Sequence, residues 1–439
     1  MEMLNENLLC ENIAVSDCGH LTFGGMDTVA LAEQYGTPLY LMDEDHIRGR
    51  CRQYRAAVNA AFGQNAHVLY ASKAASFKRI YEIMKEEQMG IDIVSIGEMY
   101  TALKAGYPLS NAYFHSSNKT DADITFAIEN GVGYFVADSE DELLAINQEA
   151  QKHRICQPVL LRITPGIDPH TFAQVATGKI DSKFGFGIET GAAEAAIQKA
   201  LSLSHLRLVG LHCHVGSQVF DSSVFLQTAD VMLDFMATMH TRLGLTCEQL
   251  GLGGGFGVRY LPNDPTLDIS GCIAEIGAFM KQKAAALNMT LPRIFFEPGR
   301  SIVADAGMTL YTVGSVKCIP DFVNYVSVDG GMTDNPRYAL YKAPYTLLQA
   351  NAMNTPHDMT ATVVGRCCES GDIVQPNVKL PSSIGRGDTV AVLTTGAYHY
   401  SMASNYNRLP RPPIVMLQNG RSYVAVRRET LDDLMACDQ

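Results

Sequence analysis

Between residues 67 and 296 the sequence alternates between short apolar runs and longer amphipathic stretches, which restricts the possible folds more than any other feature. The apolar runs lie near residues 67–72, 90–95, 112–116, 134–137, 158–163, 207–213, 248–252 and 293–296. The stretches between them, such as 77–87, 140–153 and 223–243, carry apolar residues at helical spacing. Eight strands that alternate with helices over about 230 residues predict a (β/α)8 TIM-like barrel.

The rest of the chain has a different pattern. After residue 299, runs such as 309–316, 359–364 and 389–393 are short, alternate in polarity and are separated by Gly, Pro and Asn. This pattern predicts a separate antiparallel β-sandwich or β-barrel domain. Short β-like pieces near the amino terminus can join it. We therefore expect a barrel over residues 44–298 and a β domain built from both chain ends, 1–43 and 299–439.

Composition narrows the function classes. A formal net charge of −12 argues against nucleic acid or an anionic membrane surface as a partner, since either requires a basic face. The eleven cysteines form no CxxC pair and no zinc-type spacing, so the sequence predicts neither a disulfide framework nor a metal site. Residues 1–14 lack the basic start of a signal peptide, and no run reaches the roughly 18 apolar residues of a membrane span. We expect a cytoplasmic enzyme that acts on a small molecule.

The predicted strand ends carry the residues that could do chemistry, because catalytic residues of such barrels lie where the strands end. Lys73 follows the first run and His214 follows the sixth. The glycine run Gly253-Gly254-Gly255-Phe256-Gly257 follows the seventh, and Glu297-Pro298-Gly299-Arg300 follows the eighth. Each feature also has an ordinary explanation: a solvated lysine, a structural histidine, a tight turn, and an arginine that only pairs with Glu297.

Taken together, these residue types indicate pyridoxal 5'-phosphate. A partly desolvated lysine can condense with the cofactor's aldehyde as a Schiff base. Consecutive glycines and Arg300 can hold a phosphate. A histidine can cover one face of the ring, and Glu297 can keep the pyridine nitrogen protonated so that the ring draws in electrons. The glycine run fits neither the dinucleotide nor the Walker pattern, which argues against a nucleotide cofactor.

From about Gly36 to Arg411 the chain resembles the diaminopimelate decarboxylase family, within the fold type III, alanine-racemase-like group of pyridoxal-phosphate enzymes. The resemblance rests on motifs in both predicted domains. In the barrel these are Tyr70-Ala71-Ser72-Lys73, Pro165-Gly166-Ile167-Asp168-Pro169-His170-Thr171, Lys183-Phe184-Gly185, His214-Val215-Gly216-Ser217-Gln218, the glycine run and Glu297-Pro298-Gly299-Arg300. In the β domain they are Asn335-Pro336-Arg337, Tyr341, Cys368-Glu369-Ser370, Gly396-Ala397-Tyr398 and Ser404-Asn405-Tyr406-Asn407.

The resemblance implies a role for each matching residue. Lys73 would be the Schiff-base lysine, and Cys368 the proton donor, supplied by the partner subunit of a homodimer. Residues implied to contact the cofactor are Lys73, His214 on the ring, Ser217 near the phosphate, Gly255, Glu297, Gly299, Arg300 and Tyr398. Residues implied to bind the substrate are Arg300, Arg337, Tyr341, Glu369 and Tyr398. No metal is expected.

The function implied is decarboxylation of meso-2,6-diaminopimelate to L-lysine and CO2, the last step of lysine biosynthesis. Two arginines and a glutamate suit a substrate with a second amino-acid head. The alternatives are a related decarboxylase acting on arginine, ornithine, lysine or carboxynorspermidine and, less favoured, a racemase-like activity or a non-catalytic cofactor-binding homologue. Cys367 beside Cys368 leaves the identity of the proton donor open, although adjacent strand residues face opposite ways.

Overall fold

The computed structural model describes residues 8–64, 66–168 and 182–439. The motif residues Pro169, His170 and Thr171 lie outside these described ranges. The chain divides into two compact units, which we call the barrel unit and the β unit. The barrel unit comprises Arg50–Gly257 and Thr266–Ser301, and the β unit comprises Met1–Gly49, Val258–Pro265 and Ile302–Gln439.

The barrel unit contains eight parallel strands that close on themselves, which confirms the predicted TIM-like barrel. In order around the barrel they are β5 (Ala66–Ala71), β6 (Gly90–Ile93), β7 (Ala112–Phe114), β8 (Tyr134–Ala137), β9 (Gln157–Thr164), β11 (Leu206–His212), β12 (Gln249–Gly251) and β13 (Arg293–Phe296). Closure comes from β13, which pairs in parallel with β5. A short extra strand, β10 (Phe186–Gly187), pairs with β9. Each barrel strand coincides with one of the eight apolar runs.

The strand sequences are continuous apolar runs because both faces of each strand are buried. Inside the barrel, Leu69, Val136, Leu160 and Val209 pack with aromatic rings of neighbouring strands. The ring of Tyr113 stacks on Tyr134 at 4.4 Å and lies 4.8 Å from Phe295. The barrel interior is therefore a packed core, which leaves the strand ends as the place for a site.

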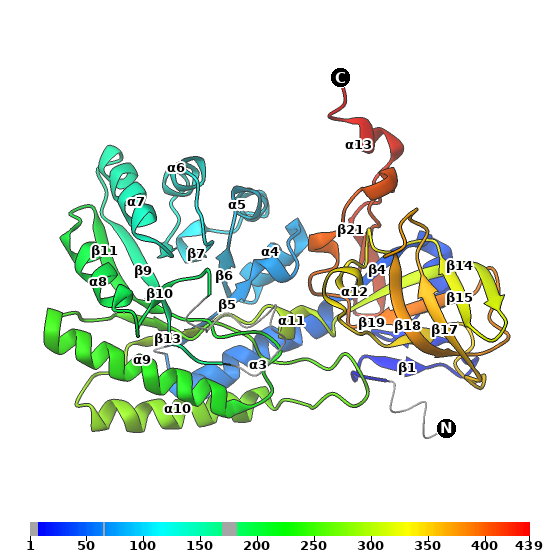
Figure 1. The fold of residues 1–439 in the computed structure, drawn as a ribbon, viewed down its shortest axis with the longest axis horizontal. Coiled ribbons are helices and arrows are strands. Elements are labelled where there is room, and N and C mark those ends of the chain that lie inside the picture. The colour runs from blue at the N-terminus through cyan, green and yellow to red at the C-terminus, as the bar shows by residue number, and fades with distance from the viewer. Residues whose placement is uncertain (1–7, 65, 169–181) are drawn as a thin grey trace. The chain divides into compact units, whose positions relative to one another are not determined.

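Helices flank these strands in sequence order (Figure 1). They are α3 (Glu44–Phe62), α4 (Lys78–Glu86), α5 (Ile96–Lys104), α6 (Asp121–Glu129), α7 (Glu140–Lys152), α8 (Ala192–Ser202), α9 (Ser222–Leu243) and α10 (Ile269–Ala286). Three of them start at a hydroxyl cap: Ser95, Thr120 and Ser139 each accept a hydrogen bond from a backbone N–H of the first turn. Each cap fixes the point where a loop from a strand end becomes a helix.

The β unit combines strands from both ends of the chain, as predicted. Its main sheet has the order β18 (Ile373–Leu380), β17 (Met359–Val364), β15 (Val323–Val328), β14 (Gly307–Ile319), β4 (Leu39–Asp43), β20 (Ile414–Gln418) and β21 (Arg421–Val426). Strand β19 (Thr389–Leu393) pairs with β14 and with β16 (Leu347–Gln349). Most pairings are antiparallel, but β15 pairs with β17 and β4 with β20 in parallel, so the sheet is mixed.

Smaller elements complete the β unit. A separate sheet contains β1 (Ile13–Val15), β2 (Leu21–Phe23) and β3 (Met26–Asp27), followed by α2 (Thr28–Tyr35). The short helices are α11 (Arg300–Val303), which begins in the barrel unit, α12 (Arg337–Tyr341) and α13 (Leu431–Met435). Within the described ranges, no helix is long and apolar enough to cross a bilayer.

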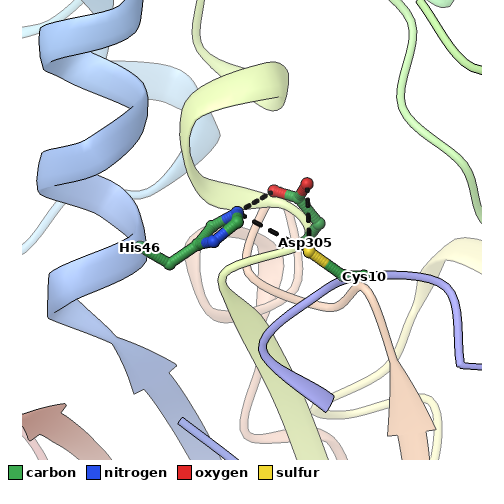
Figure 2. A group of neighbouring side chains, drawn as sticks. All are labelled: Cys10, His46 and Asp305. Carbon is green, nitrogen blue, oxygen red and sulfur yellow. Dashed lines mark hydrogen bonds and ion pairs between the residues drawn. The ribbon is translucent and has the colours of Figure 1, made fainter.

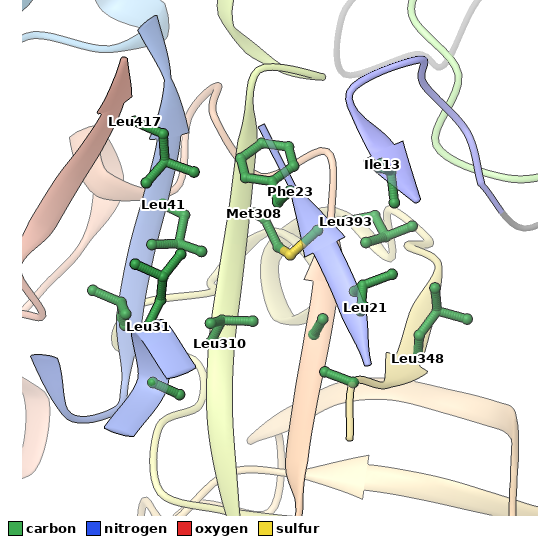
Figure 3. Packing of buried hydrophobic residues seen from close by; sticks show 14 of the residues in the cluster. Ile13, Leu21, Phe23, Leu31, Leu41, Met308, Leu310, Leu348, Leu393 and Leu417 are labelled. Atoms are coloured by element: carbon green, nitrogen blue, oxygen red, sulfur yellow. The ribbon is translucent and has the colours of Figure 1, made fainter. Parts of the chain in front are cut away.

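One hydrophobic core joins the amino-terminal pieces to the later strands (Figure 3). Phe23 of β2 and Leu31 of α2 are buried with Leu41 of β4, Met308 of β14 and Leu417 of β20. Since these residues come from both ends of the sequence, neither end can complete this core alone.

Candidate active site

Lys73 lies just beyond the carboxyl end of β5, in the short turn Ser72–Ala74. The hydroxyl of Tyr70 donates a hydrogen bond to the carbonyl of Ala75, 2.9 Å away, which fixes the turn that carries the lysine. Lys73 Nζ lies 3.7 Å from Oδ2 of Asp92, a buried residue of β6, while 45% of the lysine side chain is exposed. The amine is thus anchored by a carboxylate and remains accessible to a small molecule.

Glu297, just after β13, is buried between two histidines. Its Oε2 lies 2.8 Å from Nε2 of His212, at the end of β11, and its Oε1 lies 2.9 Å from Nε2 of His115, just after β7. The two imidazole rings meet edge to face, with centroids 4.7 Å apart. Three strand ends therefore hold one carboxylate in a fixed orientation.

The electrostatics of this group favour an ionised Glu297. Burial raises the pKa of Glu297, but the two histidines oppose burial more strongly and hold the pKa well below its ordinary value. Burial lowers the pKa of His212 to about 4, with Glu297 only partly opposing it. Because an ionised carboxylate only accepts hydrogen bonds, Nε2 of His212 carries the proton in its contact with Glu297. The result is a buried anion in contact with two imidazole rings and suited to a cationic partner.

His214 lies two residues beyond β11, next to the glycine run. Its Nδ1 accepts a hydrogen bond of 3.4 Å from the backbone N–H of Gly254. Burial, followed by the positive charge of Lys73, lowers the pKa of His214 well below its ordinary value. A neutral ring in this position can lie against a flat ligand without adding charge.

The glycine run folds back against the loop after β11. The backbone N–H of Val219 donates a hydrogen bond of 2.9 Å to the carbonyl of Gly255. Gly255 has φ +102°, and a β-carbon there would lie 2.2 Å from the carbonyl oxygen of Gly216. At Gly254 a β-carbon would lie 2.1 Å from the carbonyl oxygen of Glu297. Only glycine allows these backbones to approach so closely.

Arg300 and Ser217 meet beside this run. Arg300 Nε donates a hydrogen bond of 3.1 Å to Ser217 Oγ. Gly299 brings the same turn against β5, because a β-carbon there would lie 2.9 Å from the β-carbon of Ala71. A guanidinium, a hydroxyl and glycine backbone in one place form the kind of donor set that binds a phosphate.

In the β unit, Arg337 lies among aromatic rings at the start of α12. Its guanidinium lies 5.4 Å from the ring centre of Tyr341 and 5.3 Å from that of Tyr398, within the range of cation–π contacts. Its Nε donates a hydrogen bond of 2.8 Å to the hydroxyl of Tyr345. The β unit thus brings together three of the residues implied to bind substrate: Arg337, Tyr341 and Tyr398.

Cys367 and Cys368 follow β17 in a turn that Asp372 closes. Asp372 Oδ2 accepts the N–H of Cys367 at 2.7 Å, and its Oδ1 accepts the N–H of Met332 at 2.6 Å. Burial and then Asp372 raise the pKa of the Cys367 thiol to about 11. Cys368 is exposed, and its N–H donates to Oδ1 of Asn407 at 2.8 Å. The two thiols therefore lie in different environments.

Glu369 stabilises its own turn. Its Oε1 accepts the N–H of Gly371 at 3.0 Å and the hydroxyl of Ser370 at 3.2 Å. These contacts lie within the Cys368-Glu369-Ser370 motif and do not join Glu369 to the Arg337 group.

Sequence reasoning did not identify Asp92, His115 or Tyr345. Asp92 and His115 contact Lys73 and Glu297, and Tyr345 contacts Arg337. A signal existed for two of them, because Asp92 lies within a predicted apolar strand and His115 ends another, where a polar side chain needs a buried partner.

The barrel group fits pyridoxal phosphate by the chemistry of its donors. An accessible amine suits an aldehyde, an ionised buried carboxylate suits a protonated ring nitrogen, and the Ser217, Arg300 and glycine group suits a phosphate. A family model described as "Pyridoxal-dependent decarboxylase, pyridoxal binding domain" matches residues 44–304. The barrel unit is therefore that of a pyridoxal-dependent decarboxylase.

Comparison along the whole chain narrows this class. A diaminopimelate decarboxylase from Bacillus subtilis is 43% identical over 420 residues, which covers 96% of this chain and 95% of that protein. The structure of diaminopimelate decarboxylase from M. jannaschii in complex with L-lysine matches with a TM-score of 0.90 and 32% identity, covering 98% of each chain. The enzyme from Helicobacter pylori, also complexed with L-lysine, matches with a TM-score of 0.83 and 31% identity over 93% of this chain and 98% of that one. The chain belongs to the diaminopimelate decarboxylase family.

Proposed function

We propose that this protein decarboxylates meso-2,6-diaminopimelate to L-lysine and CO2, the last step of lysine biosynthesis, with pyridoxal phosphate as cofactor. The observation that carries the proposal is the buried Glu297 carboxylate, held by His115 and His212 at the strand ends that also carry Lys73. An anion kept ionised in a dry position is suited to a cationic ring, and family membership supplies the substrate.

Bound pyridoxal phosphate supplies an aldehyde carbon for an amino group and a protonated pyridine ring that draws electrons from the carbon losing CO2. The protein supports this chemistry with charge and position. Glu297 stabilises the proton on the ring nitrogen, and the two histidines prevent the carboxylate from turning away. Lys73 would hold the cofactor through its side-chain amine. His214, Ser217, Gly255, Gly299 and Arg300 complete the cofactor contacts.

We further propose that Arg337 binds the carboxylate that is not lost, with Tyr341, Tyr398, Arg300 and Glu369 also contacting the substrate. The aromatic rings and Tyr345 restrict the guanidinium, so less conformational entropy is lost when it pairs with a carboxylate. Ornithine and lysine end in an amine and offer Arg337 no such partner. This residue therefore favours diaminopimelate over the decarboxylase substrates considered as alternatives.

Cys368 is proposed as the acid that protonates the substrate carbon after CO2 leaves. Its thiol gives up one proton to carbon and regains one from solvent, which balances the reaction. Support comes from the exposure of Cys368 next to the partly exposed Cys367, whose thiol pKa is raised by burial and by Asp372. We propose that the proton donor comes from the partner subunit of a homodimer, so that two chains build each site.

A cytoplasmic location is also proposed. No disulfide joins any of the eleven cysteines, all of which lie in the described ranges. Thiols that remain reduced are typical of a reducing compartment.

The experiment that tests the activity is a panel of amino acids scored for CO2 release and for the amine product. Meso-diaminopimelate should be the preferred substrate and L-lysine the product. Preference for lysine, ornithine or arginine would overturn the substrate assignment, and a yellow protein that releases no CO2 would indicate a cofactor-binding homologue. Reduction with borohydride should fix the cofactor to the peptide that contains Lys73.

A further inference from the structure

Cys10, His46 and Asp305 form a compact cluster in the β unit, apart from the strand-end residues described above (Figure 2). Cys10 precedes β1, His46 lies in the first turn of α3, and Asp305 lies between α11 and β14. The side chains of His46 and Asp305 are only 7% and 11% exposed, and Cys10 is partly exposed. Three side chains from distant parts of the sequence thus present one sulfur, one nitrogen and a carboxylate to the same point.

The distances within the cluster match those between ligands of one metal ion. His46 Nε2 lies 3.3 Å from Asp305 Oδ1, and Cys10 Sγ lies 3.7 Å from His46 Nε2 and 3.7 Å from Asp305 Oδ2. A tetrahedral zinc ion has bonds of about 2.0–2.2 Å to nitrogen and oxygen and about 2.3 Å to sulfur, which places nitrogen and oxygen about 3.4 Å apart and sulfur about 3.6 Å from either. The separations match these values, but His46 and Cys10 contact different oxygens of Asp305, so the carboxylate has to turn or to use both oxygens to complete the set.

The backbone around the cluster is fixed independently of the three donors. Asn12 Nδ2 donates to Asp43 Oδ2 at 3.1 Å and to the carbonyl of Asp305 at 3.4 Å. Asp43 in turn accepts the N–H of His46 at 3.0 Å and donates its own N–H to Ala306 at 2.8 Å. These bonds connect all three ligand-bearing segments, as the outer contacts of metal sites do.

The charges of the three ligands balance a divalent cation. A divalent ion with a thiolate, a carboxylate and a neutral imidazole would be electrically neutral overall.

We propose that Cys10, His46 and Asp305 form a zinc site in which the fourth position is taken by water. On binding, the thiol releases its proton to solvent, the imidazole binds through an unprotonated Nε2, and no electron transfer is needed. Sulfur, imidazole and carboxylate are the ligand types that zinc takes in proteins. The site would connect the amino-terminal segment to α3 and β14. Its three ligands lie too far apart in the sequence to form a recognisable metal-binding motif.

A second group in the same unit provides a matched control. Cys18, His20 and Asp27 also lie close together, but Asp27 already accepts two backbone N–H groups as the cap of α2. Cys18 is exposed and bonds to Ser16 Oγ at 3.0 Å. Replacing Cys18 removes a nearby thiol without changing the proposed site.

The test is zinc retention by the cofactor-loaded, full-length protein. Wild type, Cys10→Ala, Asp305→Asn and Cys18→Ala are each incubated with one equivalent of zinc chloride and dialysed against zinc-free buffer, and zinc per chain is measured by mass spectrometry. Wild type and Cys18→Ala should retain about one zinc per chain, and the other two variants should lose most of it. X-ray absorption at the zinc edge should show one sulfur ligand at about 2.3 Å in wild type.

Three results would overturn the proposal: no zinc retained by wild type, zinc retained by Cys10→Ala, or zinc lost from Cys18→Ala. Circular dichroism shows whether each variant is folded, and Asp305→Asn serves as the second variant if Cys10→Ala is not. Because no arm measures decarboxylation, failure of the proposed function and failure of the zinc site are separate outcomes.

Discussion

Nε2 of His212 lies 2.8 Å from Oε2 of Glu297, although 85 residues separate them in the sequence. The strand β12 lies between their two strands in the barrel, so the two side chains meet across the end of one intervening strand. His115 contacts the other oxygen from the opposite direction along the barrel order. The orientation of the carboxylate is therefore determined by side chains from three strand ends of the barrel.

Glu297→Gln should retain the yellow cofactor and slow decarboxylation by orders of magnitude. The amide keeps the size of the side chain but has no charge, so it cannot stabilise a proton on the ring nitrogen. Visible absorption measures cofactor content, and CO2 release measures turnover. Turnover comparable to wild type would mean that the electron sink does not depend on this residue.

His115→Phe should lower kcat about tenfold or more, because it removes the imidazole whose Nε2 lies 2.9 Å from Oε1 of the buried Glu297 carboxylate. KM should change less, since His115 acts through Glu297 and is a positioning residue. The pH at which the bound cofactor's visible band titrates should also shift in His115→Phe. His115→Gln, which keeps an N–H donor, should recover part of the loss. An unchanged kcat and pH profile in His115→Phe would show that His212 alone suffices.

Arg337→Ala should weaken the binding of meso-diaminopimelate by tenfold or more while changing any residual activity on lysine much less. The variant removes a charge-assisted pair with the distal carboxylate, which lysine does not have. Arg337→Lys is the matched control, because it keeps the charge but loses the paired geometry. Its binding of meso-diaminopimelate should lie between that of wild type and that of Arg337→Ala. Equal losses on both substrates would contradict the assignment of Arg337 to that carboxylate.

Cys368→Ala should bind the cofactor but protonate the substrate carbon poorly. Cys367→Ala should lower the activity much less. The two thiols should also differ in alkylation near pH 8. The pKa of Cys367 is raised to about 11, so little of it is thiolate at that pH, and its reactivity should rise only as the pH approaches 11. Mass spectrometry after brief iodoacetamide treatment should find Cys368 modified first. The reverse order would assign the accessible thiol to Cys367.

Lys73→Ala and Cys368→Ala proteins, each nearly inactive, should recover activity when they are unfolded, mixed and refolded together. If one chain supplies the lysine and its partner the cysteine, a mixed dimer contains one intact site. Two tags of different size show whether mixed dimers form. Mixed dimers without recovered activity would place the lysine and the cysteine of each site on the same chain.

The barrel could be predicted from sequence because its strands are short, continuous apolar runs at regular intervals. Strand β18, in contrast, includes Pro376 and Asn377, and its pairing with β17 is interrupted by register shifts. Its alternating pattern is broken at those positions, so no strand was expected there. The parallel pairing of β4 with β20 also left no local signal, because register between distant segments depends on the closed core.

Candidate site residues could be named from sequence where a motif carries them, as with Lys73, Glu297 and Arg337. Residues that act through one of these were harder to find, because their role depends on contacts across the fold. His115 reaches Glu297 only through barrel closure, and Tyr345 reaches Arg337 across the loop after α12. A buried polar residue at the end of an apolar run indicates that a partner exists, but sequence does not name it.

Strand β4 has a consequence for synthesis of the protein on the ribosome. All five of its residues, Leu39–Asp43, are buried, yet its partner β14 begins only at Gly307 and β20 only at Ile414. At about 5–20 residues per second, roughly 13–50 s pass before β14 emerges. During that time the nascent chain carries an apolar strand that has no sheet to join. Production of this enzyme should therefore depend on how well the cell protects residues 39–43 from aggregation until translation is almost complete.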